Sequence, residues 1–223
     1  MSSDQYETGG GIRIRRIVDD TPVANAIEPI TALDTQRGAL LASNYEVAGR
    51  YTRWDMGFVD PPLVLVARGR DFRVEALNAR GRVLLPPVAR VLGALAAVER
   101  LAAANDTIDG AVRAPAGRFA EEERSRQPSI FSVLRALIDL FRHPHEPHLG
   151  LYGAFGYDLA FQFEPLRLRL PRRPDQRDLV LYLPDELVIV DHRREVAMRR
   201  RYEFEADGRS TEGLSRGGGS RPY

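Results

Sequence analysis

Two kinds of hydrophobic pattern alternate along this chain. Apolar and polar positions alternate at 12–15, 71–77 and 195–204, which predicts half-buried strands there. Short apolar runs bounded by turn residues predict further strands at 39–43, 50–54, 63–68, 83–85, 149–158, 179–183 and 187–190. Most of these strands are joined by short turns, so we expect an antiparallel meander.

Helical periodicity is confined to three segments. Apolar residues recur at steps of three and four over 22–38, 86–101 and 128–141, which predicts three helices. Gly38 would end the first, although Pro29 inside it argues against a regular helix. Residues 105–127 are polar and predict a loop. Few helices beside antiparallel strands indicate the α+β class.

The two ends of the chain lack either periodicity. Residues 1–11 are polar and end in three glycines, and residues 206–223 are rich in glycine, serine and arginine. We therefore predict a flexible tail at 1–11, a folded domain at 12–205, and a linker or truncated end at 206–223.

Composition narrows the function classes. The 223 residues are 43% hydrophobic and 28% charged, as in ordinary soluble domains. There is no cysteine, which excludes disulfides, thiol nucleophiles and thiolate metal sites. Neither a secretory signal nor an apolar run long enough to cross a membrane is present. We expect a cytoplasmic protein with no membrane partner.

The charge is nearly balanced. All 32 basic residues are arginine and face 31 acidic residues, which gives a net charge of +1. The absence of lysine excludes Schiff-base chemistry and a phosphate-loop lysine. Nucleic-acid binding domains usually carry a basic excess, so we expect no nucleic-acid partner. The arginines at 167–177 and 193–201 alternate with acids, which favours solvent-exposed strand faces.

Two motifs have a chemical and a structural interpretation. His143, His145, Glu146 and His148 are residues that can bind zinc, but prolines separate them, and a polar loop is the better interpretation. His192 lies in a predicted turn and should be exposed.

The glycines at 150, 153 and 156 resemble a phosphate loop only superficially. Their segment is apolar and no helix follows it directly, so close backbone approach within a sheet is favoured. No G-x-S-x-G elbow is present, and spacing alone indicates no active site.

Four stretches together carry a resemblance. They are 38–46 (GALLASNYE), 49–58 (GRYTRWDMGF), 150–165 (GLYGAFGYDLAFQFEP) and 178–185 (DLVLYLPD). In this order they resemble the N-terminal domain of anthranilate synthase component I, most closely the type fused to its glutamine amidotransferase. The Trp54-Asp55-Met56 stretch makes the resemblance specific, and the similarity covers about residues 12–205.

The resemblance implies a partner domain and a regulatory ligand. Full members of the family are lyases that convert chorismate and glutamine to anthranilate, pyruvate and glutamate with Mg²⁺, and tryptophan inhibits them. Their chorismate and magnesium residues lie in a C-terminal catalytic domain. This chain would then be the tryptophan-sensing and structural half of a β-sandwich, inactive alone and binding no cofactor itself. Its partners would be the catalytic domain, the amidotransferase part and L-tryptophan.

The resemblance also suggests ligand-binding residues. Leu40-Leu41-Ala42-Ser43 matches the leucine-leucine-glutamate-serine motif that begins the family's tryptophan pocket, with alanine in place of glutamate. It implies Ser43 and Leu41 as tryptophan-binding residues, and Arg53 more weakly. Without the resemblance, Ser43 is equally a hydrogen-bonded core serine.

Other interpretations of the whole chain remain open. The same domain occurs in aminodeoxychorismate synthase, although the 50–58 stretch favours anthranilate synthase. A free-standing amino-acid-binding module and a pseudogene fragment are the remaining alternatives. The apolar stretches 151–163 and 179–190 also predict a sheet face that packs against a partner.

Overall fold

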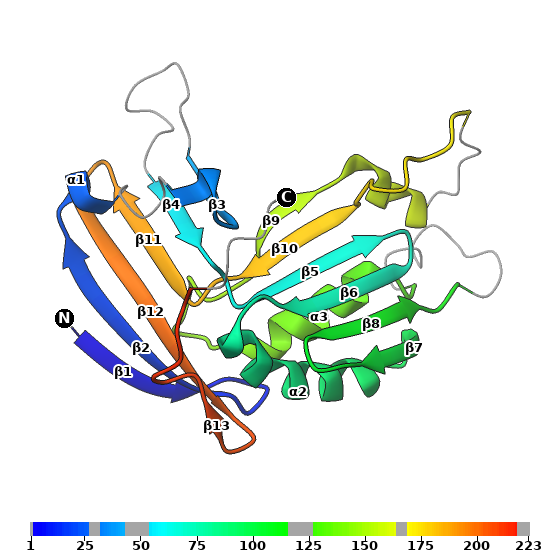
Figure 1. Cartoon of the computed structure of the whole chain (residues 1–223), viewed down its shortest axis with the longest axis horizontal. Coiled ribbons are helices and arrows are strands. Elements are labelled where there is room, and N and C mark those ends of the chain that lie inside the picture. Colours follow the sequence, from blue (N-terminus) through cyan, green and yellow to red (C-terminus); the bar gives the residue numbers. More distant parts are fainter. Residues whose placement is uncertain (1, 27–31, 43–53, 116–126, 164–168, 218–223) are drawn as a thin grey trace.

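The computed structural model describes residues 2–26, 32–42, 54–115, 127–163 and 169–217. The strands form two antiparallel sheets that diverge from a common junction, and the two longer helices pack beside the second sheet (Figure 1). The α+β class is confirmed. Within the described residues, no helix is long and apolar enough to cross a membrane.

The first sheet has the strand order β1-β2-β12-β11-β4-β3, with β13 paired to β12. Its strands are β1 Ser2–Glu7, β2 Arg13–Thr21, β3 Gly38–Leu41, β4 Trp54–Val59, β11 Glu186–Asp191, β12 Val196–Ala206 and β13 Arg209–Ser210. The long strands β2 and β12 pair over nine residues and form the backbone of this sheet. Its two edges are β1 and β3.

The second sheet has the strand order β7-β8-β6-β5-β10-β9. Its strands are β5 Leu63–Arg68, β6 Asp71–Ala76, β7 Val98–Ala103, β8 Thr107–Val112, β9 Tyr152–Phe155 and β10 Leu179–Leu183. The strands predicted at 63–68, 71–77 and 179–183 are confirmed. The edges of this sheet are β7 and β9.

Two helices supply most of the helical packing surface. α2 spans Ala79–Gly93 and α3 spans Ile130–Phe141; the described residues also contain the short α1 Val23–Ala26 and the 3₁₀ helix Tyr157–Gln162. The side chain of Asn78 caps α2, because its Oδ1 accepts hydrogen bonds from the backbone N–H groups of Arg80 (3.0 Å) and Gly81 (3.1 Å). The helix predicted at 128–141 is confirmed by α3, which begins two residues later.

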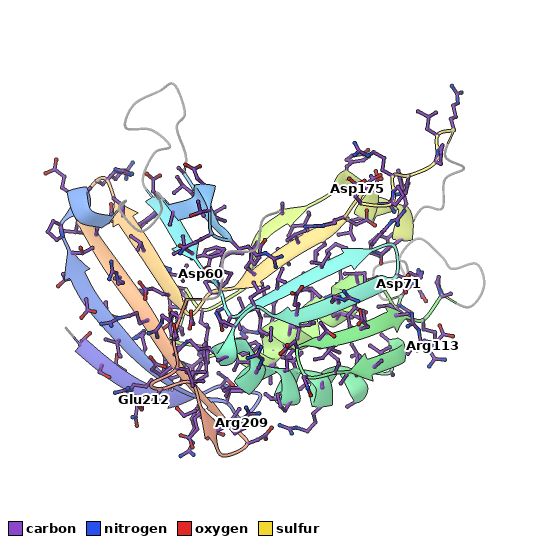
Figure 2. The ribbon with its side chains drawn as sticks, viewed as in Figure 1. Asp60, Asp71, Arg113, Asp175, Arg209 and Glu212 are labelled. Atoms are coloured by element: carbon purple, nitrogen blue, oxygen red, sulfur yellow. The ribbon has the colours of Figure 1, made fainter. Side chains whose placement is uncertain are left out.

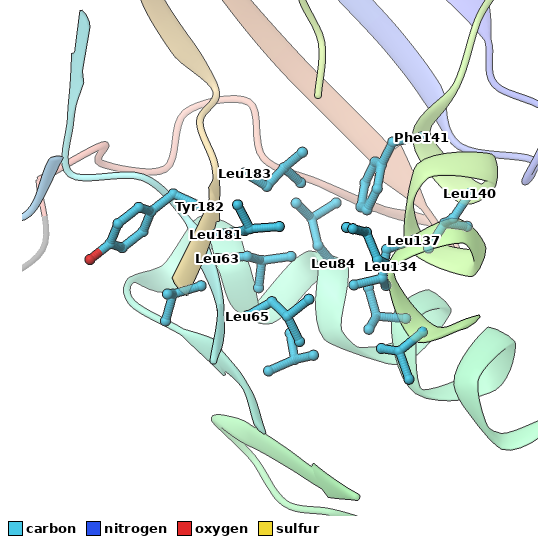
Figure 3. Close-up of a cluster of buried hydrophobic side chains, with 14 of the residues drawn as sticks. Leu63, Leu65, Leu84, Leu134, Leu137, Leu140, Phe141, Leu181, Tyr182 and Leu183 are labelled. Atoms are coloured by element: carbon cyan, nitrogen blue, oxygen red, sulfur yellow. The ribbon is translucent and has the colours of Figure 1, made fainter. Parts of the chain in front are cut away.

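The core lies between the helices and one face of the second sheet. α3 turns its apolar stripe toward β5, β10 and α2 (Figure 3). The labelled side chains are Leu63, Leu65, Leu84, Leu134, Leu137, Leu140, Phe141, Leu181, Tyr182 and Leu183. Phe141 of α3 also contacts Phe204 of β12, with ring centroids 6.2 Å apart. The helices therefore link the two sheets through one continuous core.

The flexible tail predicted for residues 1–11 is wrong for most of its length. Residues 2–7 form β1, which pairs with β2 from Ser2 opposite Val18 to Glu7 opposite Arg13. Nearly every side chain of β1 is solvent-exposed, so this edge strand shows no hydrophobic alternation. Backbone hydrogen bonds to β2 hold β1 in place, and backbone pairing of this kind cannot be recognised from the order of apolar and polar side chains.

The linker predicted for residues 206–223 begins inside the fold. Asp207 and Gly208 have φ angles of 52° and 73°, and they turn β12 back into β13. Thr211 is fully buried, and its Oγ1 accepts a hydrogen bond from the backbone N–H of Phe204 at 2.8 Å. Residues 218–223 lie outside the described residues.

The strand predicted at 83–85 is wrong, and the helix predicted at 86–101 is confirmed only over 86–93. One helix, α2, covers 79–93 and contains Pro86 and Pro87. Each proline removes a backbone donor, yet the helix continues because Leu84, Val88 and Leu92, spaced four apart, are completely buried. β7 and β8 occupy 98–103 and 107–112, so part of the predicted loop at 105–127 is a strand.

Of the helix predicted at 22–38, α1 covers Val23–Ala26, and residues 27–31 lie outside the described residues. α1 ends at Ala26, and Gly38 is the first residue of β3 rather than a helix stop. A Cβ at Gly38 would lie 2.1 Å from the carbonyl oxygen of Phe58, so the glycine permits close approach of β3 to β4.

Candidate ligand-binding edge of the first sheet

Leu41 is the last residue of β3, at the edge of the first sheet. It lies opposite Met56 of β4, and its neighbour Leu40 lies opposite Gly57. The side chain of Leu41 is 43% exposed. Ser43 and Arg53, the other residues implied by the resemblance, lie outside the described residues, so their roles stay predictions.

The face of β3 and β4 that carries Leu41 turns toward the second sheet. Residues directly opposite in an antiparallel pair share a face, and alternate residues of one strand share it too. Leu41, Met56 and Phe58 therefore lie on one face. The ring of Phe58 contacts Tyr152 of β9 and Tyr182 of β10, with centroid distances of 6.1 and 5.8 Å. At Phe58, the second sheet therefore covers this face and excludes solvent from it.

The same face is open at its other end. Trp54 precedes Met56 by two residues, so it lies on the same side of β4, and it is 42% exposed. Met56 is half-buried between the closed and the open ends. Two large apolar side chains, Leu41 and Trp54, thus reach solvent beside Met56.

The opposite face of β4 carries a contact between a carboxylate and an imidazole. Asp55 Oδ2 lies 2.7 Å from Nε2 of His192, which follows β11. The predicted turn at His192 is confirmed: the backbone N–H groups of Arg193 and Arg194 donate to Asp191 Oδ1 at 3.0 and 3.3 Å. This contact links His192, the first turn residue after β11, to the start of β4 next to Trp54.

The edge strand β9 of the second sheet also exposes aromatic rings. Phe155 is 53% exposed and stacks on Phe131 of α3 at 6.2 Å, and Tyr157, the first residue of the 3₁₀ helix that follows β9, is 87% exposed. Gly153 explains how β9 pairs with β10, because a Cβ there would lie 2.1 Å from the carbonyl oxygen of Val180. The interpretation of these glycines as sites of close backbone approach is confirmed at Gly153.

The arginine-rich strands are paired with acids, as the sequence predicts. Arg199 pairs with Glu186 at 3.4 Å, and Arg201 pairs with Asp19. Charged side chains of both signs are spread over the two sheets (Figure 2). The side chains of Arg199 and Arg201 are only 37% and 31% exposed, and Arg200 is 15% exposed and pairs with the buried Glu146, so the predicted solvated face is only partly exposed.

A buried arginine, Arg80, joins α2 to residues near the end of the described chain. No pattern in the sequence predicted that this arginine would be buried or which residues it would contact. The Arg80 side chain is almost wholly buried and pairs with Asp185 and with Glu203, whose Oε2 lies 2.9 Å from Nη1. It also donates to the backbone carbonyls of Tyr202 (2.8 Å) and Thr211 (2.7 Å). Burial raises the pKa of Asp185, although Arg80 opposes this. These partners come together only through the fold.

The amino-acid sequence of the chain is similar to those of several known proteins. No protein-family profile matches it. Over 220 residues, 98% of the chain, it is 51% identical to an anthranilate synthase of Azospirillum brasilense. Over nearly its whole length, the chain is similar to one part of that enzyme. Anthranilate synthase component 1 of Serratia marcescens is 31% identical over 70% of the chain, and that of Vibrio cholerae is 26% identical over 74%.

The chain spans about 30% of the length of each of these anthranilate synthases. The resemblance found in the sequence is therefore confirmed, and it concerns one part of the relatives' polypeptide.

The histidine cluster has a structural role. Residues 143–148 lie in the connection from α3 to β9, as predicted. The Glu146 carboxylate is fully buried and accepts hydrogen bonds from Arg16 Nη1 (2.9 Å), the Tyr202 hydroxyl (3.0 Å) and the backbone N–H of His148 (3.1 Å). Burial, and then Glu146, raises the pKa of the Tyr202 phenol.

The resemblance implies Mg²⁺ for the complete enzyme. Among the described residues, no group of three or more histidine, aspartate or glutamate side chains is arranged to hold a metal ion. The described part of the chain therefore offers no donor set that fits Mg²⁺.

Proposed function

We propose that this chain is the N-terminal, tryptophan-sensing part of an anthranilate synthase. The observation that carries the proposal is the 51% identity to the Azospirillum brasilense enzyme over nearly the whole chain, together with the fraction of that enzyme it spans. The chain contributes structure and regulation in the cytoplasm, and the lyase chemistry on chorismate belongs to the remainder of the polypeptide. By itself the chain makes no anthranilate.

The edges of the two sheets support a partner in the same assembly. β3 and β9 each leave one side of their backbone unpaired within the described sheets, and each presents exposed apolar side chains: Leu40 and Leu41 on β3, Phe155 on β9. Exposed apolar edges normally mark a surface that another chain segment covers. The catalytic part, with the amidotransferase part attached to it, is the partner that we assign to these edges.

The regulatory ligand that we propose is L-tryptophan. Ser43 would hydrogen-bond its charged end, Leu41 would contact its apolar part, and Arg53 would face its carboxylate. The exposed position of Leu41 at the end of β3 supports a ligand in this place, because a core leucine would be covered.

Two alternative functions, aminodeoxychorismate synthesis and free-standing amino-acid sensing, are less well supported. The proteins compared above are all anthranilate synthases, which favours that activity over aminodeoxychorismate synthesis. A free-standing amino-acid sensor would have no partner to cover its sheet edges, so its edge strands should not expose large apolar side chains. The exposed ring of Phe155 on β9 therefore disfavours this alternative.

A chimeric enzyme tests the proposal. Residues 1–223 would replace the matching part of the Azospirillum brasilense anthranilate synthase, and anthranilate fluorescence would be followed with chorismate, Mg²⁺ and glutamine. We expect the chimera to synthesise anthranilate and to be inhibited by tryptophan, whereas the purified 223-residue chain should give no signal with glutamine or ammonia. Anthranilate made by the chain alone, or an active chimera that tryptophan does not inhibit, would contradict the proposal.

A further inference from the structure

We propose that a groove between α2, the β7–β8 turn and β13 binds a small monocarboxylate with an apolar body. The groove lies apart from the end of β3, because α2 and β13 are low in the view of Figure 1 and β3 is high. The proposal uses only described residues and does not depend on the proposed function.

The groove has the size and the lining of a small-molecule site. Its volume is about 540 Å³, within the range of roughly 300–1,000 Å³ that ligand pockets cover. One face of α2 forms a wall, because the lining residues 82, 85, 86 and 89 are spaced three and four apart. Leu85 and Ile108 are buried beneath it, and Ala103 and Ala104 of the β7–β8 connection line the other side.

The charges that line the groove do not cancel. Arg82 Nε donates to Asp106 Oδ1 at 2.5 Å, and Arg82 Nη2 donates to Oδ2 at 3.3 Å. Arg209 also lines the groove, and its exposed side chain forms no hydrogen bond or ion pair with another described residue. Two guanidinium groups therefore face one carboxylate, which leaves one positive charge without a partner.

The β12–β13 hairpin holds Arg209 at this place. Arg209 pairs with Ala206 across the turn and is labelled in Figure 2. Asp207 in the turn forms a two-pronged ion pair with Arg90 of α2, at 2.9 Å to Nη2 and 3.2 Å to Nη1. The helix that forms the wall of the groove therefore also anchors the hairpin that carries the unpaired guanidinium.

An unpaired guanidinium beside an apolar lining is complementary to an apolar carboxylate. Arginine binds a carboxylate through two parallel hydrogen bonds, and both partners are charged. The apolar lining stabilises a hydrocarbon body by removing it from water. A dianion would leave one charge unmatched, because Arg82 is already paired with Asp106. We therefore assign a monocarboxylate that carries an aromatic ring.

An NMR titration of the methyl-labelled 223-residue chain tests the proposal with three probes. Benzoate has both the charge and the ring, benzamide lacks the charge, and acetate lacks the ring. We expect benzoate to shift the methyl signals of Leu85, Ala89 and Ile108 and to saturate with a Kd of about 0.3–3 mM. Benzamide and acetate should each bind at least about fivefold more weakly, since each loses one of the two contributions.

Two arginine variants separate the groove from general charge effects. Arg209→Gln should weaken benzoate binding about tenfold and leave benzamide binding unchanged, because the apolar lining remains. Arg193→Gln is the matched control, since Arg193 is equally exposed but lies in the turn between β11 and β12, outside the groove lining. Both positions are at the surface, so both variants should fold.

Three results would overturn the proposal. They are benzoate affinity that Arg209→Gln does not reduce, an equal loss in Arg193→Gln, and shifts that do not saturate below about 20 mM benzoate. None of these results bears on tryptophan inhibition of the chimera, so the proposed function is tested separately.

Discussion

At the scale of single residues, buried charges fasten distant parts of this chain to each other. Glu146 joins the connection before β9 to β2 and β12, through Arg16 at 2.9 Å and Arg200 at 3.4 Å. Arg80 joins the start of α2 to β12 and to Thr211. A buried charge that loses its partner is strongly destabilising, so each of these residues should be critical for stability.

Replacing Glu146 by glutamine tests this role. The variant leaves two arginines without their shared counter-charge, and the free energy of unfolding should fall by about 3 kcal/mol. Urea unfolding followed by circular dichroism measures it. Glu212→Gln is the control, because Glu212 is exposed and pairs with Arg15 at the surface, a pair worth less than about 1 kcal/mol. Equal losses in the two variants would refute the proposed role of Glu146.

The same connection should make stability depend on pH. Burial, and then the nearby Arg200, lowers the pKa of His148 below its usual 6.5. The unfolded chain then binds a proton that the folded chain resists, so the free energy of unfolding should fall as the pH drops below about 6.5. His148→Gln should remove this part of the pH dependence, and His145→Gln, at an exposed position, should keep it. Identical pH profiles for the parent and His148→Gln would contradict the assignment.

At the scale of elements, β9 depends on one glycine. Gly153 has a φ of 156°, and a Cβ there would collide with the Val180 carbonyl of β10. Gly153→Ala should therefore loosen β9 and speed amide hydrogen exchange over Tyr152–Phe155, at a cost of about 1–3 kcal/mol. Gly150→Ala, where the added carbon meets nothing within 4 Å, should leave exchange unchanged. Protected β9 amides in Gly153→Ala would show that the glycine is dispensable.

The sequence predicts elements best where side chains alone decide the structure. α3, β5, β6 and β10 have clear apolar patterns and a buried face, and they appear as predicted. α2 begins and ends earlier than predicted. Pro86 and Pro87 locally indicate a helix start, but burial of Leu84 and Val88 extends the helix on both sides of the prolines. β1 was missed because backbone pairing with β2 holds it, and that depends on its neighbour in space.

At the scale of the whole molecule, the chain has uncovered apolar edges. The isolated chain should bind a hydrophobic dye such as ANS and self-associate in light scattering, because Phe155, Tyr157 and Leu40 are exposed. Adding the catalytic part in trans should suppress the dye signal and strengthen tryptophan binding, since a ligand that bridges two parts stabilises their association. A monodisperse, dye-silent chain that binds tryptophan as tightly as a complete enzyme would favour a free-standing sensor.

The candidate site was predictable only in part. The resemblance pointed to residues 41 and 43 because a motif marks them, and the structure places Leu41 at an exposed strand end. The register of β3 and β4 places Met56 opposite Leu41, and no spacing in the sequence encodes that register. The Arg80 partners are more than 100 residues away along the chain and come together only through the topology of the sheets.

The most direct test of tryptophan sensing is the inhibition curve of Ser43→Phe in the chimeric enzyme. The phenyl group would fill space that the ligand needs, and loss of the hydroxyl would leave a polar group of the ligand unpaired, a cost of about 1–3 kcal/mol. We expect the variant to synthesise anthranilate but to need at least about tenfold more tryptophan for half-inhibition. A curve that coincides with the parent's would show that Ser43 is a core serine and that this chain does not sense tryptophan through the end of β3.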